Sequence, residues 1–493
     1  MAFDEYDDFD AVGLAELVRR GDVTPHELLD AAVSRMEARN PALNAVVYRM
    51  VERARKRVAS LPDGPLKGVP FMVKDLKLTI AGTPTSNSTK LLVDVIATRS
   101  SVLAERYEAA GLQIIGKTNT PEFGIMGITE PELRGPARNP WNPDYSPGGS
   151  SGGSASAVAA RMVPAAHSGD GGGSIRIPAS CCGLFGLKPT RGRVTMAPWT
   201  GEAWSGFVQE HVVTRSVRDS AAFLDISAQP TLGEPYAAPA VVRPFAEEVG
   251  ADPGQLRFAF TRDSLFADNN HADCVSAVDD TVELLRSLGH EVVEAMPPFN
   301  KEELVHAYFV VVAAGVARMC EIASASAGRK PRAGDFEPST WVLAQIGWKS
   351  SAADLVAAQM AIQVASRGVA EFFQTYDGFV SSTIANPPAR VGELAVGAGE
   401  RRQLALLRAL PLKPLLDFAL KKMADGRLGW TPNTQLFNQT GQPAMSVPLF
   451  WNAAGLPIGT QIVGRFGDEA MLFRLAAQLE EARPWAGRKP SLD

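Results

Sequence analysis

The chain has 493 residues, of which 45% are hydrophobic and 21% are charged. This composition is ordinary for a globular protein and excludes a largely disordered chain. The 49 basic and 54 acidic residues give a net charge of −5, and this balance argues against a nucleic-acid or anionic-membrane partner.

The first 65 residues are expected to form helices. Residues 11–20 have a helical pattern that Gly21 closes, and a second helix begins at the sequence Thr24-Pro25-His26-Glu27. This tetrapeptide has the pattern of a capping box with proline at the first helical position. The second helix is expected to stop before Asn40-Pro41, because proline interrupts a helix.

Strands and helices alternate further along the chain, which predicts an α/β layer structure. The apolar run at 68–73 is bounded by turn residues and predicts a buried strand, which Lys74 follows directly. A helix over 101–110 and a strand over 112–115 come next. The other main expected elements are strands over 256–260, 290–293, 379–384, 444–449 and 460–463, and helices over 216–227, 271–289, 301–325, 352–374 and 468–482.

Cysteine and histidine usage argues against a zinc enzyme. The four cysteines are too few for a disulfide scaffold and form no CxxC pair, and the six histidines include no HExxH motif. The acidic N-terminus does not resemble a secretory signal, and no run of 18 apolar residues suggests a membrane span. We therefore expect a cytoplasmic protein without a membrane partner.

Glycine is concentrated in one part of the chain, where it takes 11 of the 45 residues from 148 to 192. Two serine clusters lie there, GGSSGGS at 148–154 and GDGGGS at 169–174. Successive glycines allow backbone N–H groups to converge on one point. A serine at the end of such a run can attack a carbonyl carbon while these N–H groups hold the developing oxyanion.

Two common motifs occur in unsuitable surroundings. Residues 111–118 match the phosphate-binding pattern GxxxxGK[ST], but a helical pattern precedes them and their inner residues are bulky strand formers. Residues 148–152 match GxSxG, but loop sequence leads into them and no histidine follows His306. Neither a P-loop nor an ordinary α/β-hydrolase triad is expected.

A serine nucleophile needs a base, and a lysine can serve if burial lowers its pKa. Lys74 follows an apolar strand, as such a lysine should. A serine of the first cluster can then relay a proton between Lys74 and Ser174. Each feature alone is more often a solvated strand end or a flexible loop, but together they indicate acyl-transfer chemistry.

The combined motifs resemble the amidase signature family, and within it bacterial amidases of the 6-aminohexanoate-cyclic-dimer hydrolase type. The resemblance is dense over 66–194 and returns from 376 to the end. Its motifs are PGGSSGGS at 147–154, GDGGGSIRIPA at 169–179, GVPFMVKD at 68–75, GKTNTPEF at 116–123 and FNQTGQPA at 437–444.

This resemblance implies the amidase signature fold, an α/β fold with a large mixed central sheet covered by helices on both faces. It also implies a single amidase domain over 1–493. Its expected parts are a helical segment over 1–65, a catalytic core over 66–200, a variable substrate-shaping region over 201–375 and a return to the core sheet over 376–493.

The resemblance further implies the catalytic residues. Ser174 corresponds to the nucleophile, Ser150 to a bridging serine that follows a cis peptide bond, and Lys74 to the base. Asp170 and Arg176 correspond to residues that support the loop. The oxyanion hole would be formed by the N–H groups of Gly171, Gly172, Gly173 and Ser174. No role is implied for His167, Cys181 or Cys182, which are expected to be packed in the interior.

The implied function is hydrolysis of a small-molecule linear, aryl or cyclic amide through a seryl acyl-enzyme, without metal or organic cofactor. Two alternatives stay open: a glutamine-dependent amidotransferase A-type subunit that supplies ammonia to a partner, and a silent binding protein, against which the intact Lys-Ser-Ser set argues. A homodimer also stays open.

Phe123, Ile125 and Met126 are expected to line the substrate pocket, with the helix around 308–319 as its far wall. These apolar side chains predict an uncharged, rather apolar acyl group and not free glutamine. The cyclic-dimer hydrolases have an asparagine where this chain has Ile125, which puts an identical substrate in doubt.

Overall fold

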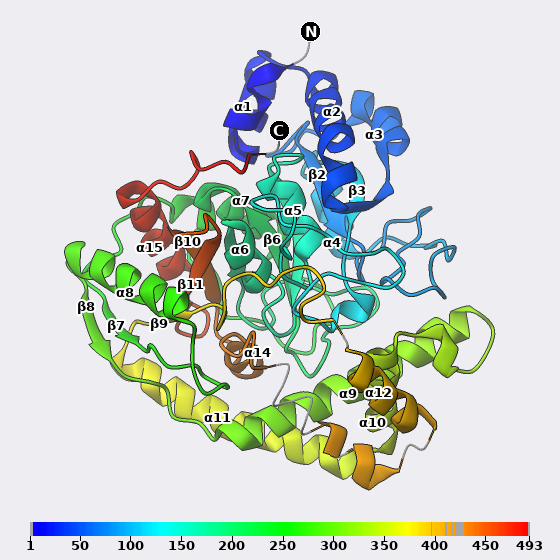
Figure 1. The fold of residues 1–493 in the computed structure, drawn as a ribbon. Coiled ribbons are helices and arrows are strands. Elements are labelled where there is room, and N and C mark those ends of the chain that lie inside the picture. Colours follow the sequence, from blue (N-terminus) through cyan, green and yellow to red (C-terminus); the bar gives the residue numbers. More distant parts are fainter. Residues whose placement is uncertain (1–2, 396, 410–411, 417, 421–427, 492–493) are drawn as a thin grey trace.

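The computed structural model describes residues 3–395, 397–409, 412–416, 418–420 and 428–491 (Figure 1). Its strands are β1 (Val46–Arg49), β2 (Pro70–Lys74), β3 (Gln113–Thr118), β4 (Ala165–Asp170), β5 (Phe185–Lys188), β6 (Gln209–Thr214), β7 (Arg257–Phe260), β8 (Glu291–Glu294), β9 (Gly378–Ser382), β10 (Ala444–Trp451) and β11 (Pro457–Gly464).

These strands form one sheet of eleven, in the order β1-β3-β2-β4-β6-β5-β10-β11-β9-β7-β8. β2 is parallel to both β3 and β4, and β7 is parallel to both β8 and β9. The remaining pairs are antiparallel. The predicted α/β class with a large mixed sheet is therefore confirmed.

Helices surround this sheet. They are α1 (Ala11–Arg20), α2 (Pro25–Leu43), α3 (Val51–Arg57), α4 (Val102–Ala109), α5 (Gly152–Ala159), α6 (Arg176–Cys182), α7 (Val217–Ser227), α8 (Ala272–Ser287), α9 (Lys301–Ser326), α10 (Pro338–Lys349), α11 (Ala352–Thr375), α12 (Ala398–Ala409), α14 (Gln435–Thr440) and α15 (Glu469–Ala482). Figure 1 shows α1–α3 and both chain ends at one end of the molecule, and α9, α10 and α12 at the other.

The predicted start of α2 is confirmed, but its predicted end is wrong. The Glu27 N–H donates to Thr24 Oγ1 at 3.2 Å, and the Thr24 N–H donates to the Glu27 carboxylate at 2.8 Å, which completes the capping box. The helix continues through Pro41 to Leu43. Asn40 explains this, because its side chain binds both backbone groups of Val46, at 2.8 and 3.0 Å, and so anchors the last turn to β1.

The glycine-rich stretch is more regular than its composition indicates. It contains α5, β4, α6 and β5, because its small residues allow these elements to pack closely in the interior. The region over 201–375, expected to shape the substrate site, includes the strands expected near 256–260 and 290–293. It supplies β6, β7 and β8 to the sheet as well as the helices α9–α11.

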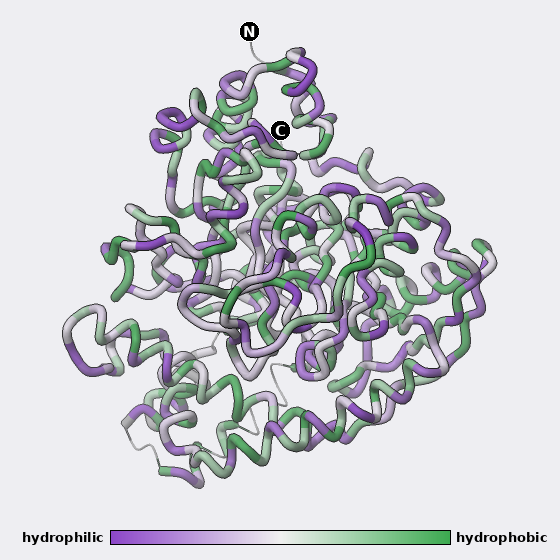
Figure 2. The backbone as a smooth tube through the Cα atoms, turned by 180° about the vertical axis from the view of Figure 1, so that it is seen from behind, coloured by the Kyte–Doolittle hydropathy of each residue, from purple (hydrophilic) through white to green (hydrophobic). Residues whose placement is uncertain are grey.

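The apolar interior forms two main clusters, one around the sheet and one between α9, α10, α11 and their neighbours. Figure 2 shows apolar and polar stretches alternating along the long helices. Among the residues described, α9 is long and apolar enough to cross a membrane by length and composition alone. However, 56% of its most apolar window is buried inside the protein, as in the core helix of a globular fold.

Helices α9 and α10 approach each other closely at Gly347 of α10. A Cβ atom there would lie 2.2 Å from the carbonyl oxygen of Ala313 in α9. Gly368 of α11 has more room, because the nearest atom to an added Cβ would be 3.4 Å away.

We predict that Gly347→Ala lowers the free energy of unfolding by about 1–3 kcal/mol, because the added methyl group forces the two backbones apart. Gly368→Ala is the matched control, and alanine inside a helix should leave stability unchanged or raise it by about 0.5–1 kcal/mol. Urea denaturation of the two variants measures both effects. Equal stability of the two variants would contradict the close packing of α9 on α10.

Candidate active site

Two neighbouring strands bring the candidate base and the nucleophile loop together. β2 ends at Lys74 and β4 ends at Asp170, and the two strands are parallel neighbours. Their carboxyl ends therefore lie at the same edge of the sheet. Ser150 precedes α5, and Ser174 lies in the turn between β4 and α6. Lys74 and the turn that carries Ser174 thus lie at one edge of the sheet although they are far apart in the sequence.

Lys74 is almost completely buried, with 1% of its surface exposed. Its Nζ donates to Ser150 Oγ at 2.7 Å and to the carbonyl oxygen of Gly169 at 3.4 Å. The Gly149–Ser150 peptide bond is cis. Burial lowers the pKa of Lys74 to about 7, although the carboxylates of Glu210 and Asp170 act in the opposite direction. The amine can therefore be uncharged near neutral pH and accept a proton.

Ser174 lines a cavity, with 9% of its surface exposed. No hydrogen bond joins its hydroxyl to Ser150 in the part of the chain that the structure describes. The preceding glycines are needed for close approach: a Cβ at Gly172 would lie 2.2 Å from the Tyr308 hydroxyl, and one at Gly173 would lie 2.3 Å from Thr434 Oγ1. Gly173 also has φ +122°, which favours glycine.

The four expected oxyanion donors are not equivalent. The Gly173 N–H donates to Asp170 Oδ1 at 2.7 Å, so it faces this carboxylate, which corrects the expectation that it faces the substrate. Within the described ranges, the N–H groups of Gly171, Gly172 and Ser174 have no hydrogen-bond partner. These three donors are therefore available to a developing negative charge.

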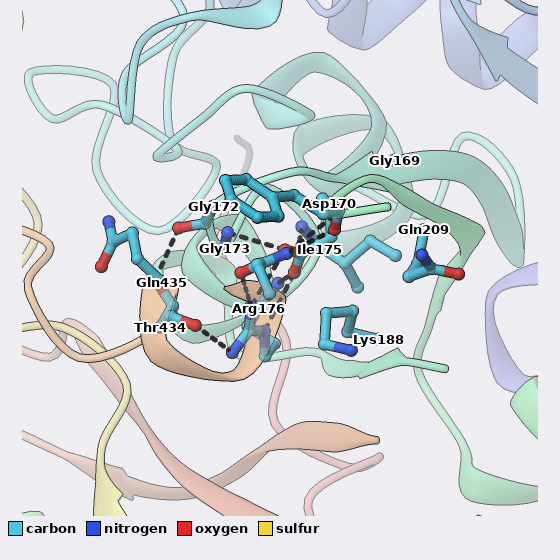
Figure 3. Close-up of polar contacts among 12 residues, drawn as sticks. Gly169, Asp170, Gly172, Gly173, Ile175, Arg176, Lys188, Gln209, Thr434 and Gln435 are labelled. Atoms are coloured by element: carbon cyan, nitrogen blue, oxygen red, sulfur yellow. Dashed lines mark hydrogen bonds and ion pairs between the residues drawn. The ribbon is translucent and has the colours of Figure 1, made fainter. Parts of the chain in front are cut away.

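Asp170 and Arg176 form a buried ion pair under the turn, with Nη2 and Oδ1 2.9 Å apart (Figure 3). Burial alone would raise the pKa of Asp170, but the charge and hydrogen bonds of Arg176 outweigh it and hold that pKa well below its usual range. The guanidinium also donates to the Thr434 carbonyl at 3.0 Å and to the side-chain oxygens of Gln461 and Asn438, each at 2.6 Å. Asp170 and Arg176, the two residues expected to support the loop, thus contact each other, and three residues of the C-terminal region bind the Arg176 guanidinium.

The cavity over Ser174 has a volume of about 590 Å³. Ile125 and Met126 line it as expected. Phe123 does not, because its side chain is buried behind the wall with its ring 5.9 Å from that of Phe336. The expected far wall is supplied by Tyr308, Phe309 and Val312 of α9. Further apolar lining comes from Trp204, Leu343, Leu404, Leu407 and Trp430.

Several polar groups at or beside the cavity were not predicted from the sequence. The Tyr308 hydroxyl lies beside Gly172. Gln435 donates from Nε2 to the Thr431 carbonyl at 2.6 Å, while its buried Oε1 has no partner among the residues described. Thr434 and Gln435 directly precede the FNQTGQPA motif, so proximity to that motif is the signal that points to them. Tyr308 lies within the long apolar helix α9, and nothing in the sequence distinguishes its hydroxyl from the other side chains of that helix.

The structure also shows where the residues of the other motifs lie, namely the P-loop-like motif, the two cysteines and His167. Residues 113–118 of the P-loop-like motif form β3, and Lys117 is buried with Nζ 2.7 Å from Thr85 Oγ1. Burial raises the pKa values of the Cys181 and Cys182 thiols, which makes them poor nucleophiles. His167 is buried with Nε2 3.1 Å from the Glu210 carboxylate. No group of three or more His, Cys, Asp or Glu side chains within the described ranges is placed to hold a metal ion.

Comparison with known proteins agrees with this site. The family model for amidases matches residues 27–473. The 6-aminohexanoate-cyclic-dimer hydrolase of Paenarthrobacter ureafaciens is 36% identical over 493 residues, which cover 98% of this chain and 96% of the relative. A solved structure of 6-aminohexanoate cyclic dimer hydrolase with substrate has a TM-score of 0.91 at 34% identity and covers 99% of both chains.

A bacterial aryl acylamidase of the amidase signature family has a TM-score of 0.85 at 26% identity, covering 97% of this chain and 99% of its own. Both the family match and the identity extend over nearly the whole chain. The chain therefore belongs to the amidase family of the amidase signature fold, and it is an amidase, a hydrolase that acts on carbon–nitrogen bonds.

Proposed function

We propose that this amidase hydrolyses a small, uncharged and largely apolar amide through an acyl-enzyme on Ser174. The observation that carries the proposal is the contact of the buried Lys74 amine with Ser150 Oγ at 2.7 Å. A lysine with a pKa of about 7 is a competent base near neutral pH. A histidine is therefore not required.

In the proposed first half-reaction, Lys74 takes the proton of Ser150 while Ser150 takes that of Ser174. Ser174 Oγ then attacks the amide carbonyl carbon. The free N–H groups of Gly171, Gly172 and Ser174 hold the oxyanion, and one such donor is typically worth about 10²–10³ in rate. The proton returns through the same relay to the leaving amine as the carbon–nitrogen bond breaks.

In the second half-reaction, a water molecule attacks the ester carbonyl and gives its proton to the relay. Ser174 Oγ takes a proton back as the carboxylic acid leaves. A covalent intermediate divides one difficult step into two easier ones. The relay requires Ser150 and Ser174 to come within hydrogen-bond distance, and such contacts often tighten only when substrate is bound.

The chemistry of the cavity favours an apolar acyl group. Its lining includes no lysine, arginine or histidine among the residues described, so a free carboxylate would have no cationic partner. Glu393 is the charged side chain there, and its carboxylate accepts the Arg390 N–H at 2.8 Å. Burying the α-carboxylate of glutamine without a partner would be costly. This argues against the amidotransferase-subunit alternative.

The names of the relatives agree with this substrate class. The cyclic dimer of 6-aminohexanoate and the aryl acylamides both present an amide beside a long or flat apolar group. Ile125 and Met126 offer such a group apolar area close to Ser174. We therefore propose linear, cyclic or aryl amides with a methylene-rich or aromatic acyl part as substrates.

We predict that Ser174→Ala lowers kcat/KM for hexanamide by at least about 10⁴-fold, because it removes the proposed nucleophile. A fluorophosphonate should label the wild-type enzyme on Ser174 and leave the variant unlabelled, as read by peptide mass spectrometry. Ser326→Ala, which changes an exposed serine at the end of α9, is the control and should behave as wild type. Labelling on Ser150 or Cys182, with Ser174→Ala still active, would refute the assignment.

We predict that kcat/KM rises about fourfold for each methylene group added from acetamide to hexanamide. Burying one methylene group contributes about 0.8 kcal/mol of free energy, which corresponds to this factor. Glutamine should be a poorer substrate than hexanamide. Ile125→Asn should reduce this increase of kcat/KM with chain length, because it places a polar amide on the cavity wall. Ile125→Leu should preserve the increase. A preference for glutamine would reject the apolar pocket and favour the amidotransferase alternative.

A further inference from the structure

We propose that Thr434 is a positioning residue for catalysis. Its hydroxyl holds the Gly172–Gly173 peptide in the orientation that directs the neighbouring N–H groups at the oxyanion. This inference rests on the proposed role of Ser174 and its turn, and it gives the segment before the FNQTGQPA motif a function.

The first observation is the direction of the Thr434 hydroxyl. Thr434 occupies the N-cap position of α14, where a threonine hydroxyl ordinarily accepts a bond from its own helix. It makes no such bond. It donates instead to the carbonyl oxygen of Gly172 at 2.6 Å, across a separation of 262 residues (Figure 3). The side chain therefore serves the nucleophile turn and not the helix that it begins.

The second observation is that the Gly172–Gly173 peptide is held at both of its polar groups. The carbonyl oxygen of Gly172 accepts from Thr434, and the N–H of Gly173 donates to Asp170 Oδ1 at 2.7 Å. A peptide unit is planar, so bonds at its two ends prevent it from rotating. The unpartnered N–H groups of Gly172 and Ser174 belong to the peptide units on either side of this one, so holding it in place restricts the orientations that they can adopt.

The third observation is the close fit of Thr434 against the turn. A Cβ atom at Gly173 would lie 2.3 Å from Thr434 Oγ1, so only glycine permits this approach. The carbonyl oxygen of Thr434 accepts from Arg176 Nη1 at 3.0 Å. One residue thus binds the glycine turn through its hydroxyl and the supporting guanidinium through its backbone.

Loss of the hydroxyl should act on the transition state more than on substrate binding. The N–H groups meet full negative charge only when the carbonyl becomes tetrahedral, so a misaligned turn lowers kcat and leaves KM nearly unchanged. A role limited to stability would lower the amount of folded enzyme and would not alter kcat per active site. Titration of active sites with fluorophosphonate separates the two.

The test compares Thr434→Val, which replaces the hydroxyl with a methyl group, and Thr434→Ser, which keeps the hydroxyl. With hexanamide as substrate, we expect kcat per titrated site to fall about 10–100-fold in the valine variant, with KM within about threefold of wild type. The serine variant should stay within about threefold of wild type. Thr440→Val is the control, because that hydroxyl bonds to the Leu436 carbonyl at 2.9 Å and to the Gln442 side chain, and not to the nucleophile turn.

Wild-type kcat in Thr434→Val would overturn the inference, and so would equal impairment of the valine and serine variants. If the valine variant does not fold, Thr434→Ala removes the same hydroxyl without added bulk and is judged by the same criteria. The result for Ser174→Ala separates this inference from the proposed function. An inactive Ser174→Ala with a fully active Thr434→Val overturns only the role of Thr434, whereas an active Ser174→Ala overturns the nucleophile assignment itself.

Discussion

The proposed mechanism depends on the burial of one lysine. Lys74 ends a fully buried strand, and its amine contacts Ser150 Oγ, with no carboxylate ion-paired to it among the residues that the structure describes. Burial disfavours the charged amine, while the charge of Glu210 and Asp170 favours it. The Asp170 carboxylate that acts on this lysine is itself ion-paired with Arg176, with Nη2 and Oδ1 2.9 Å apart, beside the turn that carries Ser174.

The sheet explains why distant segments can build such a site. β4 lies beside β2 and leads into the turn that carries Ser174, so the proposed base and the proposed nucleophile reach the same edge of the sheet. The segment at 434–438 approaches that turn from the C-terminal part of the chain and binds it through Thr434 and Asn438. The cavity wall comes from α9, which the central region supplies. The proposed catalytic residues and the cavity wall on α9 therefore come from different parts of the sequence.

The glycine-rich and apolar surroundings of Lys74, Ser150 and Ser174 are local in the chain, so the sequence was sufficient to select them as candidates. The structure brings Lys74 and Ser150 together, while the catalytic roles of the three residues stay a prediction. The sequence was also sufficient for α1 and for the start of α2, where the capping residues are adjacent. The sequence was not sufficient for features that depend on contacts between residues far apart in the chain. The packing of Phe123 against Phe336, the bond of the Gly173 N–H to Asp170 and the hydroxyl of Tyr308 beside Gly172 all follow from tertiary structure.

The most direct test of an uncharged Lys74 is the rate at which a fluorophosphonate labels Ser174 as a function of pH. Phosphonylation needs the base but no leaving amine, so it reports the acylating relay alone. Since the lysine must be neutral, the rate constant should rise about tenfold per pH unit below pH about 7 and level off above it. A rate that is independent of pH between about 5 and about 9, or one that still rises steeply at about 9 as for an ordinary lysine, would contradict this account.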